Sequence, residues 1–239
     1  MQAKTILYAL VALAGAAAAA PSQLEPRFDW GTEKRTAQVT IRNESPEEIK
    51  SVSLVHKYSS VYKHRALWPV IGRGQSAKNE TTVEYNIGPL TTGRDWWMLS
   101  FFSSDAKTQY VTDPNNFREV VDFLETLGTV TTISLAGATA GVLGMLAGPV
   151  TSIAASTAAA ALAKAASDSL YNSETTVGFK QHILRSEDAD QLTTITVNAD
   201  YSVTFSSKSG ISRTVTAKRP AKIQVKDQDG KVVEESEQK

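Results

Sequence analysis

The chain has 239 residues, which is long enough for one large domain or two small ones with a substantial core. Its 25 lysine and arginine residues balance its 25 aspartate and glutamate residues, so charge gives no case for nucleic acid as a partner. Cysteine is absent, which excludes thiol catalysis, cysteine-ligated zinc and disulfides, and a secreted form must be stabilised by its hydrophobic core.

Residues 1–20 have the order of a secretory signal peptide. Met1–Lys4 is a short positive start, and Thr5–Ala20 is an apolar stretch that ends in alanines. A membrane anchor is the alternative, but the stretch is short and weakly hydrophobic for a span. We therefore expect a secreted, extracellular protein, with residues 21–34 as a linker.

The triplets that begin at Asn43 and Asn79 are acceptor sequences for N-linked glycans. In a protein that passes through the secretory route, both asparagines are candidate glycosylation sites. Residues 227–239 are polar and charged, and we expect them to be a disordered tail.

Apolar and polar residues alternate from Thr36 onward, which is typical of half-buried strands. Ala37, Val39 and Ile41 fall on one face of the first strand. Stretches rich in Gly, Ser, Asn and Asp separate the strands and predict turns. The expected strands in this half are 36–43, 49–59, 81–87, 95–104 and 108–112.

A helical insert is expected at about residues 113–171. Asp113 is a good N-cap, Pro114 suits the first helical position, and apolar residues then recur every three or four positions. From Thr126 to Ala163 the sequence carries no charge. Pro149 divides this stretch into the arms Gly128–Gly148 and Val150 to about Leu170, which predicts a helical hairpin.

Strand periodicity returns after the insert, so the chain is mainly β. Many short strands with regular turns are typical of a sandwich or barrel. We expect one domain, residues 35–226, that is an antiparallel β-sandwich interrupted by the helical hairpin. The later strands are expected in 175–186, 193–200, 201–207, 211–218 and 221–227.

Catalytic signatures such as a nucleophile elbow, a metalloprotease helix or a phosphate-binding loop are absent from the sequence. His56 and His64 have the even spacing that would place both on one face of a strand. A hydrolytic or metal site could use them, but no carboxylate accompanies them at suitable spacing, and solvent-facing strand histidines are favoured. We expect the protein to have no enzymatic activity and to bind neither a cofactor nor a metal ion.

Aromatic residues interleave with lysine and arginine in the first half of the chain. This mixture suits lipid head groups, a membrane–water interface or sugars, whereas core packing is the alternative. Trp96 and Trp97 are adjacent in one strand, so one can fill the core while the other faces outward. The candidate ligand-binding residues are Tyr58, Tyr62, Trp68, Arg94, Trp96 and Trp97.

Three stretches, VHKYSSVYK (Val55–Lys63), YNIGPLTTGRDWW (Tyr85–Trp97) and DPNNFR (residues 113–118), resemble the Up-regulated-in-Daf (PUD) domain family. The resemblance runs from about Arg35 to Lys218. It implies an aegerolysin-like β-sandwich, a fold of small lipid-binding proteins of which some form pores with a partner, and it implies no enzymatic activity.

The insert permits three hypotheses. Its first arm would be about 31 Å long as a helix, close to the hydrocarbon thickness of a bilayer. The pairs Gly137/Gly141 and Gly144/Gly148 would allow close helix–helix approach in a membrane or an oligomer. Its few large apolar residues disfavour a permanent span. Conditional membrane insertion and packing on the protein itself or on a second subunit both stay open.

The leading functional hypothesis is therefore a secreted, non-enzymatic protein that binds lipid head groups or a membrane surface. The alternative is a secreted module that binds a protein or glycan and uses the insert for dimerisation. The expected partners are lipid head groups or a membrane surface, and a homo- or hetero-oligomer.

Overall fold

The computed structural model describes residues 31–58, 62–88, 95–114, 131–134, 141–148, 153–171 and 177–236. The expected signal peptide and the linker up to residue 30 lie outside these ranges.

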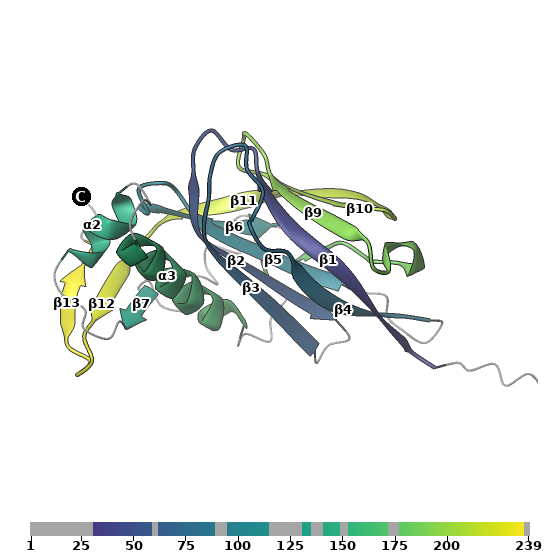
Figure 1. Ribbon diagram of the computed structural model, residues 1–239, viewed down its shortest axis with the longest axis horizontal. Coiled ribbons are helices and arrows are strands. Elements are labelled where there is room, and N and C mark those ends of the chain that lie inside the picture. Colours follow the sequence, from purple (N-terminus) through teal and green to yellow (C-terminus); the bar gives the residue numbers. More distant parts are fainter. Residues whose placement is uncertain are drawn as a thin grey trace, which may run out of the picture. The chain divides into compact units, whose positions relative to one another are not determined.

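In the described part of the chain, one ten-stranded sheet dominates the fold (Figure 1). Its strands are β1 (Glu33–Asn43), β2 (Ile49–Tyr58), β3 (Tyr62–Ile71), β4 (Thr81–Ile87), β5 (Asp95–Phe102), β6 (Thr108–Asp113), β8 (Lys180–Gln181), β9 (Leu192–Val197), β10 (Val203–Ser207) and β11 (Gly210–Pro220). The order is β3-β2-β5-β6-β11-β10-β9-β1-β4, and β8 pairs with β5. Neighbouring strands are antiparallel except β1 and β9, which are parallel. A short 3-10 helix, η1 (Ser186–Asp188), precedes β9.

The sheet is mainly one continuous layer that curls until it is nearly closed. The first part of β11 pairs with β10, and the second part, from Val215, pairs with β6. The expected β-sandwich with an aegerolysin likeness is not confirmed, because β11 joins the two halves that would form its separate layers.

The edge strands β3 and β4 contact each other across the remaining gap. The sequence did not predict β3, which contains Pro69. Proline donates no ladder hydrogen bond, and it is tolerated here because β3 is an edge strand.

The interior of the sheet holds the main hydrophobic core. Ala37, Val39 and Ile41 of β1 are fully buried there, as their alternation predicted. All ten residues of β2 are buried, because one face of β2 lines this core and the other lies under helix α3 (Ile153–Tyr171). The same core contains Trp97 and Phe205.

The second expected arm of the insert forms α3, whereas the first arm differs from the prediction. Thr131–Ser134 is strand β7, and α2 is confined to Val142–Ala147. The run Thr131, Thr132, Ile133 is β-branched and favours an extended chain. Gly141 then adopts φ +104°, which allows α2 to begin. The helix expected after Asp113 lies outside the described residues from position 115.

A smaller sheet adjoins the helices, with the order β13-β12-β7. Strand β12 (Ile223–Lys226) pairs in parallel with β7 and antiparallel with β13 (Val232–Glu235). The disordered tail expected after Lys226 is therefore wrong for residues 227–236, which form a turn and a strand. Buried residues of α2, α3 and β12 form a second core with Phe102 of β5.

Helix α3 packs through small residues. Its buried face includes Ala155, Ala159, Leu162 and Ala166 at helical spacing. Because alanine side chains are short, the helix axis can lie close to β2 and β3 (Figure 1). None of the described helices is long and apolar enough to cross a membrane.

Candidate functional site

Three of the aromatic residues predicted to bind a ligand are buried: Tyr58, Trp68 and Trp97 are at most 6% exposed. Their polar atoms are bonded within the protein. The Tyr58 hydroxyl donates to Glu84 Oε2 at 2.6 Å, and the Trp68 indole donates to the Asn79 carbonyl at 2.9 Å. The two hydrogen bonds connect β2 and β3 with β4 and with the bend before it, across the gap between the edge strands. The buried rings of these residues therefore offer no exposed face to a lipid head group.

Trp97 and Trp96 alternate as predicted. Trp97 is fully buried, and its indole donates to the His182 carbonyl at 2.9 Å. Trp96 is half-buried and packs on a small cluster that includes Phe179 on the opposite face of β5. Arg94 and the side chain of Tyr62 lie outside the described residues.

His56 and His64 lie on neighbouring strands rather than on one strand. The register pairs them directly across β2 and β3, and their rings stack with centroids 6.1 Å apart. His56 is also stacked on Trp97 at 3.9 Å. The sequence prediction missed Asp95, whose Oδ1 lies 3.1 Å from His56 Nε2. Asp95 starts β5, and only the β2–β5 register brings it to His56.

The His56–Asp95 pair is buried, with side-chain exposures of 1% and 3%. Burial lowers the pKa of His56, although the hydrogen bond and charge of Asp95 act in the opposite direction. Asp95 Oδ2 accepts the Leu184 amide at 2.9 Å, so the carboxylate also holds the segment after β8. The geometry is that of an internal structural pair with no access for a substrate.

The glycines of the insert do not mediate close helix packing in the described residues. A Cβ atom placed on Gly141 or Gly144 would meet nothing within 4 Å. Gly148 is the C-cap of α2, and Gly137 lies outside the described residues. Gly141 and Gly148 lie at the two ends of α2, and the described glycines show no close helix–helix approach.

The two glycosylation candidates differ in access. Asn43 is fully buried, and its amide nitrogen donates to the Glu47 and Ile71 carbonyls, both at 2.9 Å. Its side-chain oxygen accepts bonds from Ser45. A glycan cannot be accommodated at Asn43 in this fold. Asn79 lies in an exposed bend before β4.

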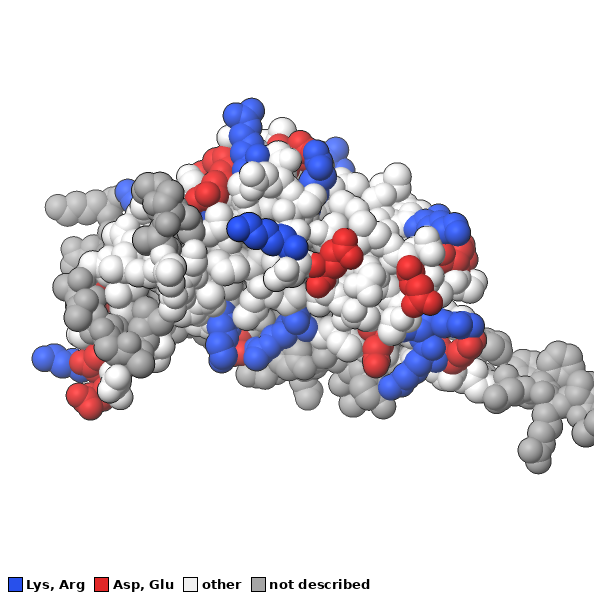
Figure 2. Space-filling view, in the orientation of Figure 1, with Lys and Arg blue, Asp and Glu red and all other residues white. Residues whose placement is uncertain are grey.

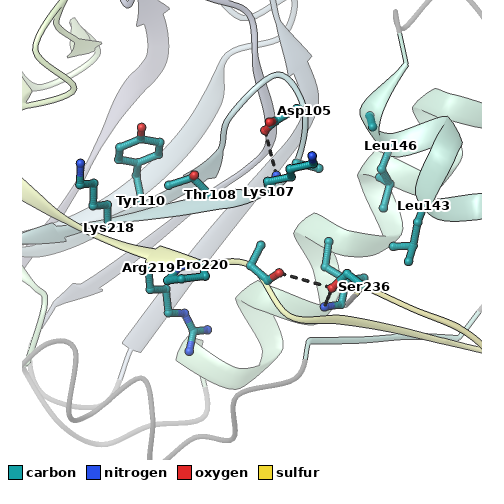
Figure 3. A pocket seen from close by; sticks show the side chains of 14 residues that line it. Asp105, Lys107, Thr108, Tyr110, Leu143, Leu146, Lys218, Arg219, Pro220 and Ser236 are labelled. Atoms are coloured by element: carbon teal, nitrogen blue, oxygen red, sulfur yellow. Dashed lines mark hydrogen bonds between the residues drawn. The ribbon is translucent and has the colours of Figure 1, made fainter. Parts of the chain in front are cut away.

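A cavity of about 730 Å³ lies where β6, β11, β12 and α2 meet (Figure 3). It is within the range of roughly 300–1,000 Å³ that is typical of small-molecule sites. Its walls are mixed in character. The lining residues are Asp105, Ala106, Lys107, Thr108, Tyr110, Leu143, Leu146, Ala147, Lys218, Arg219, Pro220, Ala221, Ile223 and Ser236.

The polar wall comes from β6 and β11. Lys218 is paired with Tyr110 across these strands, and Lys107 directly precedes β6. Figure 3 shows Lys218 beside Tyr110, on the side away from α2. Burial and the Glu47 carboxylate raise the pKa of Tyr110, so its hydroxyl stays protonated.

Cations outnumber acids in this lining by three residues to one. Partial burial of Asp105 opposes its ionisation, but hydrogen bonds from Ser103 and the Lys107 amide, together with the Lys107 charge, lower its pKa below the usual value. Arg219 donates to Gln109 at 2.8 Å. Among the described residues, no carboxylate forms an ion pair with Lys107 or Lys218, and both side chains are exposed. The rim therefore carries excess positive charge.

The apolar wall comes mainly from α2. Leu143 and Leu146 project from α2 toward the cavity, opposite the Tyr110 side (Figure 3). Ile223 of β12 and Pro220 complete this wall. The cavity thus has Lys218 and Tyr110 at one end and aliphatic side chains of α2 at the other, with Lys107 between them (Figure 3).

Charged side chains fasten α2 at both ends. The buried Lys50 of β2 donates from Nζ to the carbonyls of Leu146 at 2.8 Å and Gly148 at 2.7 Å. At the other end, Glu234 Oε2 accepts the amides of Gly141 at 3.1 Å and Leu143 at 3.0 Å. A cation at the C-terminus and an anion at the N-terminus both favour the helix dipole.

The described residues contain no group of three or more histidine, aspartate or glutamate side chains placed to hold a metal ion. The face drawn in Figure 2 mixes lysine and arginine with aspartate and glutamate, so its described residues form no continuous basic stripe.

The family model described as Up-Regulated in long-lived daf-2 matches residues 33–216. The chain belongs to this family. The match covers β1 to most of β11 in this Up-Regulated in long-lived daf-2 domain, and it confirms the family expected from the sequence. Lys218, Ile223 and Ser236 of the cavity lie beyond the matched residues. No curated protein matches the chain.

Sequence reasoning missed the cavity. Its walls come from the β5–β6 loop, the insert and the segment after β11, which are distant in sequence. One local signal was available: Lys50 interrupts the apolar stripe of β2, and a buried lysine requires acceptors from another segment.

Proposed function

We propose that this protein is a secreted, non-enzymatic lipid-binding protein that holds its ligand in the cavity between α2 and the β6–β11 edge. The observation that carries the proposal is the polarity of the cavity, which combines a cationic rim with an aliphatic wall. An anionic lipid matches both parts, because its head can pair with lysine while its acyl chain leaves water. The resemblance to lipid-binding aegerolysins supports the same function, and the sandwich topology implied by it remains a proposal.

Vesicle flotation tests this function. The mature protein is mixed with vesicles of phosphatidylcholine alone or with added phosphatidylserine. We expect binding to the anionic vesicles, and loss of this binding in the double variant Lys107→Glu/Lys218→Glu. The matched control, Lys208→Glu/Lys231→Glu, changes two exposed lysines in turns away from the cavity by the same charge and should bind like wild type.

Binding that is equal in both double variants would rule out the cavity as the site. Absence of binding to every mixture would overturn the function itself.

A protein- or glycan-binding module that oligomerises through the insert is the second candidate. It is favoured by apolar side chains on the helices, since Ile153 is 88% exposed and Met145 is 40% exposed. Light scattering of wild type and Ile153→Lys tests it. An oligomer that becomes a monomer in the variant supports this candidate, and a wild-type monomer contradicts it.

A further inference from the structure

We propose that the ligand of the cavity is a single-chain amphiphile with an anionic head. The head lies at Lys218 and the adjoining rim, which includes Lys107, and the chain runs along the accessible surface of Leu143 and Ala147, over the buried Leu146 and Ile223. This inference rests on the proposed function and specifies the class of lipid.

The size of the cavity favours one chain. A volume of about 730 Å³ matches a ligand of drug-like size, which a single acyl chain with its head resembles. The aliphatic wall is short, because it is provided by the six-residue helix α2 and the first residues of β12.

The charge distribution selects the head. Lys218 stands beside Tyr110 on the polar wall, and Lys107, which directly precedes Thr108 of β6, lies between that wall and α2 (Figure 3). Asp105 Oδ1 accepts from Ser103 Oγ at 2.6 Å and from the Lys107 amide at 2.9 Å, and the Asp105 charge partly offsets that of Lys107. The exposed ammonium of Lys218 therefore favours a carboxylate or phosphate head over a neutral or cationic one.

The positions of the two walls fix the orientation. Lys218 and Tyr110 lie on the side opposite Leu143 and Leu146 in Figure 3. A molecule with charge at one end and hydrocarbon at the other fits this arrangement in one direction only. An anion without a chain would fill only the rim, and a neutral hydrocarbon would leave the lysines without a counter-charge.

Calorimetric titration of the full mature chain tests the proposal, with dodecanoate below its micellar concentration as the first probe. We expect saturable binding of one molecule per chain. Shortening the chain to decanoate should weaken binding about tenfold, because two methylene groups lose their burial. The neutral ester 1-monolaurin should bind about fivefold to tenfold more weakly than dodecanoate.

Variants locate the two ends of the ligand. Lys218→Gln should weaken dodecanoate about fivefold, whereas Lys208→Gln in the β10–β11 turn should not change it. Leu143→Gln should flatten the dependence on chain length, since Leu143 is partly exposed and its replacement leaves the α2 fold in place. Lauroyl lysophosphatidate as a parallel probe distinguishes a phosphate from a carboxylate head.

Two results would overturn the inference. One is equal affinity for dodecanoate and 1-monolaurin, which would show that an anionic head does not contribute to binding. The other is no binding of either acidic probe while anionic vesicles still bind in a manner that depends on Lys107 and Lys218. That second result would contradict the single-chain ligand but leave the proposed lipid-binding function in place. Loss of vesicle binding as well would contradict both proposals.

Discussion

Lys50 carries a positive charge at a position that is 1% exposed. Its ammonium group donates to the carbonyls of Ser104, Leu146 and Gly148, which replace the water it has lost. These acceptors come from the β5–β6 loop and from the C-terminal end of α2, two segments that also line the cavity, and Glu48 Oε1 lies 3.6 Å from the same ammonium group. A single buried side chain thus connects the main sheet to the candidate site.

Replacing this group with a neutral chain of similar length should be costly. Lys50→Met leaves buried carbonyls without a donor, and we expect the free energy of unfolding to fall by about 2–4 kcal/mol. Urea titration measures the change. The control Lys231→Met, at an exposed turn, should stay within about 0.5 kcal/mol. Equal midpoints for the two variants would show that the Lys50 contacts do not stabilise the fold.

The three described histidines should make stability depend on pH. Burial lowers the pKa of His56, His64 and His182 below 6.5. Below pH 6.5 the unfolded chain therefore binds more protons than the folded one, and the free energy of unfolding falls as pH falls. The buried His56 alone contributes a slope of up to about 1.4 kcal/mol per pH unit.

Urea midpoints at pH 7.5 and pH 5.5 test this expectation, and the midpoint should be lower at pH 5.5. His56→Gln keeps a donor for Asp95 but cannot titrate, so the difference between the two midpoints should shrink in this variant. An unchanged pH difference would mean that His56 is not held neutral.

The glycosylation candidates give a prediction at single residues. When the chain is expressed through a eukaryotic secretory route, Asn79→Gln should remove the glycan-dependent shift in electrophoretic mobility. Asn43→Gln should leave the shift in place, because the native Asn43 amide is buried and fully bonded. A glycopeptide that contains Asn43 would contradict the structure.

At the scale of elements, α2 depends on its surroundings. It is six residues long and contains Gly144, and helices this short are not stable alone in water. The Glu234 carboxylate binds two amides at its N-terminus, and Lys50 binds carbonyls at its C-terminus. Its conformation is therefore imposed by the two sheets that flank it.

Hydrogen exchange of Glu234→Gln tests this dependence. The neutral amide loses the charge-assisted bonds to Gly141 and Leu143, so the amides of residues 142–147 should exchange about tenfold faster, a change that corresponds to about 1.4 kcal/mol. The variant Glu235→Gln, at the neighbouring exposed position, serves as control. Faster exchange in both variants, or in neither, would contradict the role given to Glu234.

Helices and strands in which apolar residues recur at a regular spacing were predictable from the sequence. Strands that form only by pairing with a distant segment were not. Strands β1, β4 and β9 follow from apolar alternation, and α3 follows from its alanine-rich helical face. β7 and β13 are four residues each, and they form because β12 pairs with both. No local pattern identifies such partners.

At the scale of the whole molecule, the aromatic residues show why composition does not reveal which side chains are exposed. Tyrosine and tryptophan beside lysine suit a membrane interface, but they also suit a core that needs hydrogen bonds at its edge. Tyr58 and Trp68 belong to the second kind, because they bond to β4 and to the bend before it across the gap in the sheet. The cavity instead combines residues from the middle and from the C-terminal part of the described chain, which only the assembled fold brings together.

The central claim is that an acyl chain occupies this cavity against α2. Photocrosslinking with a diazirine-bearing fatty acid, followed by peptide mapping, tests it most directly. We expect the label on the peptide that contains Leu143 and Leu146 and on the one that contains Ile223, with unlabelled dodecanoate suppressing both. Label that falls on other peptides, or that dodecanoate does not suppress, would contradict the claim.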